Sequence, residues 1–363
     1  MKTLRNYLMR QHIAPFLFGI AVFTFIFLAS KMVFIFNLVI NKGVSPLAMA
    51  KLLLYSLFPT LLLTVPMGIL LANLIALGSL SSNNEITAIK SSGINPVSVL
   101  VPVLISGCLI SFALCLSYNN LIPQYNHRLE EQTYLLGQKQ PTLQLQENAF
   151  NDIGKIQIYV RRIHPKTSLL EDVIISEIDP SSSKFITART GELIASKESS
   201  RLLLKLTDGA IHQPDKEDKN KFQVLCFNVH NINLNLPEIS ALKRNKKIHE
   251  MTTSEIKEKI KTFNAGTETE INPLLVESHK RTSLPFACLS FTLLGIPMGL
   301  RVRQKSKSIS FGISIAVIFG YWLLLAFAET MGIRGIAPPF LLMWAPNIIF
   351  AAFGITLLAK SIK

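Results

Sequence analysis

Six long stretches with almost no charged residues constrain this chain more than any other feature of its sequence. The stretches are residues 13–40 (interrupted only by Lys31), 52–77, 96–122, 282–300, 308–328 and 335–359. Each is long enough to cross a hydrocarbon core of about 30 Å, because an α-helix rises about 1.5 Å per residue. The sequence therefore predicts a multi-pass membrane protein with six transmembrane helices.

A long polar segment separates the first three spans from the last three. Within it, hydrophobic and polar residues alternate as they do in strands with one buried face, and Thr207-Asp208-Gly209 has the composition of a turn. The alternating hydrophobic positions are Ile156, Ile158, Val160, Ile232, Leu234 and Leu236. We therefore predict an α+β membrane protein in three parts: transmembrane helices 1–3 in residues 1–122, an inserted β-jelly-roll or sandwich domain with helical linkers in 123–272, and transmembrane helices 4–6 in 273–363.

The net charge of +14 is concentrated beside the membrane spans. Residues 127–270 carry 21 Lys and Arg against 20 Asp and Glu, whereas the rest of the chain carries 16 against 3. This distribution argues against a nucleic-acid-binding surface. Basic residues beside the spans instead indicate how the chain is oriented in the membrane. By the positive-inside rule, both termini and the 78–95 loop lie in the cytoplasm, and 123–272 lies on the opposite side.

The sequence lacks the common signatures of catalysis and of nucleotide or metal binding. It contains no Gly-x-x-x-x-Gly-Lys-Ser/Thr loop, no His-Glu-x-x-His and no Gly-x-Ser-x-Gly. Its four cysteines and seven histidines show no metal-ligand spacing. We therefore expect a chain that is not an enzyme and that has no cofactor or metal of its own.

A polar interruption at residues 81–93 separates the second and third spans. Residues 85–90 form a short amphipathic helix pattern with Ile86 and Ile89 on one side, and Ser82 and Glu85 are spaced as a capping box. Such a cytoplasmic helix between two spans, with a single carboxylate, is predicted to contact another protein.

Two charged residues within or beside the spans are further candidates. Lys31 lies about 27 Å along the first span from Ile13, so it either reaches the outer headgroups or faces a cavity and pairs with an anionic ligand. Glu329, at the outer end of the fifth span, either pairs with Arg334 or serves a lateral gate; we favour the structural pair.

Four stretches of the sequence carry a resemblance to a known family. They are Leu80-Ser81-Ser82-Asn83-Asn84-Glu85-Ile86-Thr87-Ala88-Ile89-Lys90-Ser91-Ser92-Gly93, Leu206-Thr207-Asp208-Gly209, His279-Lys280-Arg281 with Leu294-Gly295-Ile296-Pro297-Met298-Gly299, and Pro338-Pro339 with Trp344-Ala345-Pro346-Asn347. Together with the layout of three spans, a β-domain and three spans, they resemble the LptF/LptG permeases, the membrane subunits of the lipopolysaccharide-transport ABC complex. The Asn84-Glu85-Ile86-Thr87 form and the Lys42-Gly43-Val44-Ser45 loop look more like LptF than LptG.

The resemblance implies a subunit of the bacterial inner membrane with a periplasmic domain. The implied partners are a second permease of this type, a cytoplasmic LptB-like ATPase dimer that binds the ATP, lipopolysaccharide, and an LptC/LptA-like periplasmic bridge built from jelly rolls. The complex would take lipopolysaccharide from the outer leaflet of the inner membrane and pass it towards the outer membrane.

The resemblance also implies roles for particular residues. Residues 81–93 would form a coupling helix seated in the ATPase. Its contacts would come from Glu85, Ile86, Ile89 and Lys90. The lipid would be held near Lys31, Phe34, Lys42 and Arg281, with Phe34 standing where a second basic residue is often found.

Two functions of other classes remain open at this point. A transporter of an anionic lipid or solute driven by an ion gradient would need carboxylates inside the spans, but Glu85, Glu277 and Glu329 all lie near span ends. A non-transporting envelope scaffold would leave Lys31 and the Glu85 helix without a role.

Overall fold

The structure is a computed structural model of the whole chain. It describes residues 2–40, 45–94, 96–139, 145, 147–153, 156–164, 169–177, 184–195, 202–214, 222–234, 246–262, 268–301 and 307–362. These residues form two compact units. One, here called the helical unit, comprises Met1–Ser30, Leu54–His127 and Lys246–Lys363, and the other, the sheet unit, comprises Lys31–Leu53 and Arg128–Asn245.

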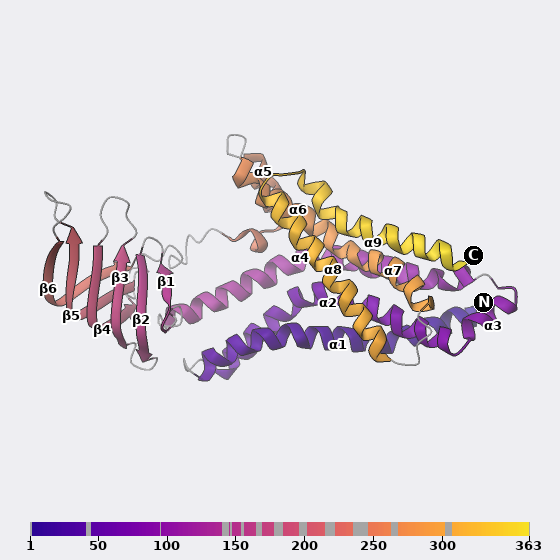
Figure 1. Cartoon of the computed structure of the whole chain (residues 1–363), viewed down its shortest axis with the longest axis horizontal. Coiled ribbons are helices and arrows are strands. Elements are labelled where there is room, and N and C mark those ends of the chain that lie inside the picture. The colour runs from indigo at the N-terminus through magenta and orange to yellow at the C-terminus, as the bar shows by residue number, and fades with distance from the viewer. Residues whose placement is uncertain are drawn as a thin grey trace. The chain divides into compact units, whose positions relative to one another are not determined.

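The six predicted spans are confirmed as helices long and apolar enough to cross a membrane. The helices of the chain are α1 (Lys2–Ile40), α2 (Pro46–Ser82), α3 (Glu85–Ser91), α4 (Pro96–Lys139), α5 (Thr253–Thr262), α6 (Glu268–Ser283), α7 (Ala287–Arg301), α8 (Lys307–Ile333) and α9 (Pro339–Ile362), with 3₁₀ turns η2 (Ile248–Glu250) and η3 (Leu284–Phe286). In the helical unit α9 lies beside α7 and also beside α8 (Figure 1). The predicted α+β membrane fold is therefore confirmed.

Two helix ends differ from the sequence prediction. The uncharged stretch predicted as the third span ends at residue 122, but α4 continues through Pro123 to Lys139, where the polar residues still favour a helix. The fourth span is not one regular helix, because η3 separates α6 from α7 at Leu284-Pro285-Phe286. Proline lacks a backbone N–H and disfavours the regular helical ladder, which explains the tighter turn at this point.

Close helix contacts in the helical unit depend on glycine. A Cβ added at Gly19 of α1 would lie 3.0 Å from the Cα of Gly68 in α2, so these two helices touch backbone to backbone. A Cβ added at Gly299 of α7 would lie 2.7 Å from the carbonyl oxygen of Asn73 in α2, and one at Gly295 would lie 2.9 Å from the Asn73 Cβ. Small residues four apart permit such approach between membrane helices. The motif at 294–299 is thus a packing motif between α7 and α2.

The sheet unit contains six antiparallel strands whose spatial order follows the chain. They are β1 (Phe150–Ile153), β2 (Ile156–His164), β3 (Leu169–Glu177), β4 (Lys184–Ala195), β5 (Leu202–Pro214) and β6 (Phe222–Leu234) (Figure 1). The predicted β-domain is therefore present. Among the described strands, however, it is a single meander rather than the two facing sheets with Greek-key order that define a sandwich or jelly roll.

The predicted turn at Thr207-Asp208-Gly209 is wrong, because these residues lie inside β5. Asp208 has φ 54° and is skipped in the pairing with β4 and β6, and Asp172 in β3 has φ 51° and is skipped in the same way. Aspartate tolerates positive φ. Gly209 is required because a Cβ there would lie 2.3 Å from the Thr187 carbonyl oxygen. These residues, which have the composition of a turn, therefore mark a line of positive-φ, unpaired positions across the neighbouring strands. We call this line the crease.

This crease shifts the side-chain alternation of the strands. In β2 the buried positions step by two from Ile158 to Val160 and then by three to Ile163, and in β3 they step by three from Leu170 to Val173. The buried side of the sheet continues across the crease only because of this shift, since strict alternation would turn the later residues outward.

Candidate functional site

Helix α3 follows α2 after a two-residue turn at Asn83 and Asn84. Asn84 has φ 59°, and its carbonyl oxygen accepts the first helical hydrogen bond from the Ala88 amide. The predicted capping box is wrong: Ser82 is the last residue of α2, and its hydroxyl donates to the Ser79 carbonyl oxygen at 2.9 Å. The sharp turn at Asn84, whose side chain tolerates positive φ, therefore starts α3 in place of a serine cap.

The carboxylate of Glu85 is bound within the chain. The Tyr7 hydroxyl of α1 donates to Glu85 Oε2 at 3.0 Å, and the Gln11 amide donates in turn to the Tyr7 oxygen. The Asn83 amide lies 3.5 Å from Glu85 Oε1. Tyr7 and Glu85 are 78 positions apart, so no local sequence signal links them. The contact connects α3 directly to the start of α1.

The hydrophobic side of α3 faces its own chain. Ile86 and Ile89 pack against a buried cluster in the helical unit. Its members are Leu8, Leu77, Leu80, Val99, Leu100, Val103 and Ile296. Thr87, Ala88 and Ser91 are exposed, whereas the side chain of Lys90 lies outside the described residues. The exposed side of α3 is therefore formed by these small residues, which sequence reasoning missed.

Of the four residues predicted to hold lipid, the structure describes the side chains of two, Lys31 and Arg281. Lys31 lies on α1 with an exposed side chain. Phe34 lies on the same helix, with a side chain outside the described residues, and Lys42 also lies outside them. Arg281 is completely buried, so in this structure it does not present its charge to lipid.

Arg281 instead holds three segments of the helical unit together: α6, α4 and the segment that contains Ile248 and Met251. Its guanidinium donates to the carbonyl oxygens of Met251 (2.7 Å) and Ile248 (3.1 Å) and to Glu277 Oε1 (3.1 Å). The guanidinium carbon lies 5.8 Å from the centre of the Tyr118 ring in α4. Removing a charge from water is tolerable only when it is paired and fully bonded, and these contacts meet that requirement. We call this group the Arg281 cluster.

Glu329 forms an ion pair, but not with the residue we expected. Its two carboxylate oxygens accept from Lys280 Nζ at 2.7 and 2.9 Å, whereas the prediction named Arg334. The pair joins α8 to α6 one residue before Arg281. Glu329 therefore forms a structural ion pair, as predicted, but its partner lies on another helix.

A short connector leads from residue 246 into α5 beside the Arg281 cluster. Helix α5 begins at Thr253 and is capped by Thr252: the Glu255 amide donates to the Thr252 hydroxyl, and the Thr252 amide donates to Glu255 Oε2. A hydrogen bond from Lys246 lowers the pKa of the Glu255 carboxyl below its ordinary value, with a further contribution from the Thr252 amide. Partly exposed polar contacts thus hold the connector to the start of α5.

A cavity of about 100 Å³ lies among α1, α2, α4 and α7. His12 Nδ1 lies 2.8 Å from the Leu8 carbonyl oxygen. Within the described part of the chain, His12 Nε2 and the Asn73 side-chain amide nitrogen, both buried in this region, have no hydrogen-bond partner. Polar atoms facing a small cavity are the arrangement that an internal water satisfies.

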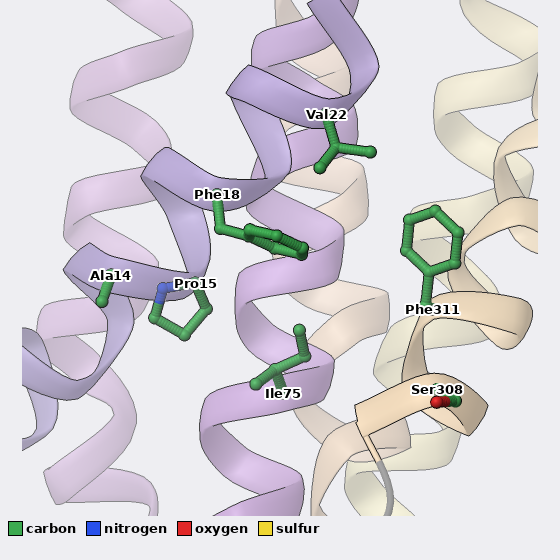
Figure 2. Close-up of a pocket in the computed structure, with 7 residues that line it drawn as sticks. All are labelled: Ala14, Pro15, Phe18, Val22, Ile75, Ser308 and Phe311. Atoms are coloured by element: carbon green, nitrogen blue, oxygen red, sulfur yellow. The ribbon is translucent and has the colours of Figure 1, made fainter. Parts of the chain in front are cut away.

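A larger apolar cavity of about 550 Å³ lies between α1 and α8. Figure 2 shows Phe18 and Val22 of α1 facing Phe311 of α8, with Ile75 projecting from α2 below them in this view. Ala14, Pro15 and Ser308 complete the lining. Its size falls within the range of ligand-binding pockets, about 300–1,000 Å³. No sequence signal distinguishes these lining residues, because apolar residues are found along every span.

The sheet unit offers an edge on which another strand can add. Of the six described strands, β1 and β6 are outermost, with 4 and 13 residues. Val224, Leu225 and Val229 on β6 are about half exposed. A long, hydrophobic edge strand presents unpaired backbone groups that can receive a strand from another protein.

Comparison with known proteins identifies a relationship over nearly the whole chain. A family model described as the lipopolysaccharide export system permease LptF/LptG matches residues 6–360. The match therefore includes both sets of membrane helices and the sheet between them. No curated protein matches the chain.

Proposed function

Because the chain belongs to the lipopolysaccharide export system permease LptF/LptG family, we propose that it is the transmembrane subunit of an ATP-driven complex. The complex extracts lipopolysaccharide from the outer leaflet of the bacterial inner membrane and passes it to a periplasmic bridge toward the outer membrane. The observation that carries this proposal is the family match across residues 6–360. Within the family, the sequence leans towards LptF.

In this proposal the chain supplies movement and binding rather than catalysis. ATP is bound and hydrolysed by a cytoplasmic LptB-like ATPase dimer, and this chain carries no cofactor. The ATPase pushes on α3. Two contacts support transmission from α3 to the spans: Glu85 accepts a hydrogen bond from Tyr7 of α1, and Ile86 and Ile89 pack against residues of α1, α2 and α4. A displacement of α3 therefore acts on several helices at once.

Lipid is held on the opposite side of the membrane by this chain and a second LptF/LptG-type permease. Lys31, exposed on α1, is proposed to pair with a lipid phosphate, and Lys42 and Phe34 follow it in sequence. When the spans shift, the acyl chains are squeezed out of an apolar cavity between the two permeases. Their preference for apolar surroundings favours transfer to the next apolar surface over release into water.

The sheet unit is proposed to hand the lipid to an LptC/LptA-like bridge protein. β6 supports this step because it is a long outermost strand among those described, with exposed hydrophobic side chains. Cys226 on β6 is exposed and provides a native crosslinking site. Maleimide crosslinking from Cys226 should capture the bridge protein in intact cells, and Cys226→Ser should remove the product. A bridge that crosslinks equally well to the Cys226→Ser variant would place the contact elsewhere.

The central test is the coupling role of Glu85. In proteoliposomes containing the whole complex, Glu85→Ala should lower both ATPase association and ATP-dependent lipopolysaccharide release by about tenfold, as expected for loss of a hydrogen bond to a charged group. Glu258→Ala changes another exposed carboxylate, on α5, and should leave both unchanged. Unchanged release by Glu85→Ala would refute the coupling role, and lipid release without any ATPase would favour a gradient-driven transporter.

The lipid contact at Lys31 is tested separately. A photoreactive amino acid at this position should form adducts with lipopolysaccharide in the intact complex. The same amino acid at Phe25, an exposed position of α1, should not enrich that lipid. Absence of a lipopolysaccharide adduct at position 31 would reduce Lys31 to a residue that reaches the headgroups of surrounding lipids.

A further inference from the structure

A buried carboxylate and two histidines meet where the connector passes α4. Glu250, the last residue of η2, is 2% exposed, and its Oε2 lies 3.0 Å from Nδ1 of His127 on α4. His249, the residue before it, presents a ring nitrogen within 4.8 Å of a Glu250 carboxylate oxygen. Imidazole nitrogens and a carboxylate oxygen are the ligands that zinc binds in proteins. The group is therefore a candidate metal site.

The local sequence gives no signal for this group. His127 and Glu250 are 123 positions apart, whereas zinc motifs are recognised in sequence by ligands that lie a few residues apart. The expectation of no metal rests on that local spacing. It does not report ligands that the fold brings together from distant positions.

Hydrogen bonds hold these side chains and their backbone in place. The Lys247 amide donates to Glu250 Oε1 at 3.2 Å, which orients the carboxylate. The Asn126 side-chain amide donates to the His249 carbonyl oxygen at 3.0 Å. Arg281 donates to two other carbonyl oxygens of the same segment. Supporting contacts of this kind keep ligands in the geometry that a metal requires.

We propose that His127, His249 and Glu250 bind a zinc ion that fastens the connector to α4. Zinc ligands lie about 2.0–2.2 Å from the metal, so two of them are about 3.4 Å apart in a tetrahedral site. The 3.0 Å between His127 Nδ1 and Glu250 Oε2 requires only a small adjustment. Zinc takes the place of the proton between these two atoms, and the neutral ring then carries its proton on Nε2. Glu130, three residues after His127 on α4, or a water molecule completes the coordination.

The donor set selects zinc over other occupants. Calcium and magnesium prefer oxygen ligands, whereas two imidazoles favour zinc. A metal-free ion pair between His127 and Glu250 accounts for the buried carboxylate but not for a second imidazole beside it. The ring of His127 is half exposed, so an ion can reach it from solvent. The orientation predicted from the basic residues places the connector outside the cytoplasm. The site does not depend on the transport function proposed above.

Zinc binding can be measured by isothermal titration calorimetry on the full-length protein, purified in detergent with a tag that contains no histidine and treated with a chelator. We expect one zinc ion per chain. His127→Gln and His249→Gln should each weaken binding by about tenfold or more. His164→Gln is the matched control and should leave binding unchanged, because His164 also lies against a carboxylate, 2.8 Å from Glu171 Oε1, in an exposed pair on the sheet.

Two further readouts distinguish a metal site from an ion pair. Cobalt(II), used in place of zinc, should give a visible absorption band in the unmodified protein and in His164→Gln, and His127→Gln should lose it. Zinc should raise the unfolding midpoint of the unmodified protein but not that of His127→Gln. Glutamine can still donate a hydrogen bond to Glu250, so this variant should fold.

Three results would overturn the site. Absence of zinc binding would leave His127 and Glu250 as an ion pair. Binding retained in both His127→Gln and His249→Gln would place the ion elsewhere. An equal loss in His164→Gln would show that zinc binds exposed histidines without preference.

Discussion

Two polar groups in the helical unit use hydrogen bonds in opposite ways. The Arg281 cluster is buried, and its guanidinium is bonded to Glu277 and to the carbonyl oxygens of Ile248 and Met251. The Glu85 cluster, formed by Tyr7, Gln11, Asn83 and Glu85, has hydrogen bonds that are exposed to solvent. The first group is costly to disrupt, whereas the second can exchange its partners with water or with another protein.

This difference in burial suits the Arg281 cluster to supporting the fold and the Glu85 cluster to coupling with a partner. A buried charge that loses its partners retains its desolvation cost, so the Arg281 cluster should fix the connector and α6 to α4. An exposed hydrogen bond adds little net stability, because water replaces it. The Glu85 cluster is therefore suited to rearrangement when a partner engages α3, while the apolar residues beneath α3 keep the helix in place.

The largest expected loss of stability follows Arg281→Gln. The change leaves Glu277 without its buried partner and removes hydrogen bonds to two carbonyl oxygens, which should cost about 3–5 kcal/mol. Thermal unfolding of the purified protein in detergent measures this loss. Arg301→Gln is the control. Arg301 is exposed, and its guanidinium donates a hydrogen bond of 3.2 Å to the Leu357 carbonyl oxygen. Similar losses for both variants would show that burial does not distinguish the Arg281 cluster.

A smaller loss should follow Gly299→Ala, which tests the packing that holds the Glu85 end of the unit. The new methyl would lie 2.7 Å from the Asn73 carbonyl oxygen and 2.9 Å from the Leu77 Cβ, so α7 must move away from α2. Overpacking of this kind costs about 1–3 kcal/mol. Gly312→Ala on α8 is the matched control, since an added Cβ there meets no atom within 4 Å. An unchanged unfolding midpoint for Gly299→Ala would mean that this contact is looser than the geometry indicates.

A weaker effect is expected from Glu255→Gln at the start of α5, where a partly exposed ion pair joins Lys246 of the connector to Glu255. Because the folded pKa of Glu255 is lowered, its ionised form contributes stability above the ordinary value of 4.5, and this contribution is lost as the pH falls through the lowered folded value. Solvent screening limits the contribution to roughly 0.5 kcal/mol or less. Unfolding midpoints between neutral and acidic pH should therefore converge for Glu255→Gln and the unmodified protein. Glu258→Gln should show no such convergence.

The architecture could be predicted because its causes lie in the local sequence. Uncharged stretches of sufficient length form membrane helices, since a charge in the hydrocarbon core is expensive, and alternation at Ile156, Ile158 and Val160 predicts a strand with one buried face. The crease at Asp208 could not be recognised, because the same residues favour a turn or a positive-φ position inside a strand. Only the register of the neighbouring strands distinguishes these outcomes.

The roles of individual charges were harder to predict than the fold. Arg281 binds the backbone carbonyls of Ile248 and Met251, and carbonyls have no sequence signature. Glu329 pairs with Lys280, 49 positions away, although Arg334 is nearer in sequence. Such contacts depend on how helices distant in the chain are packed together, which hydrophobic periodicity does not specify.

The smallest expected effect on stability comes from Tyr7→Phe, and it gives the sharpest test of the comparison. The variant removes the hydroxyl that binds Glu85 and keeps the ring, so we expect no measurable change in the unfolding midpoint. If Glu85 acts on α1 through this hydroxyl, however, Tyr7→Phe should reduce ATP-coupled lipid release, and adding it to Glu85→Ala should cause no further loss. Additive losses would show that Tyr7 and Glu85 act independently. A clear fall in the unfolding midpoint would instead place the Glu85 cluster with Arg281 as structural support.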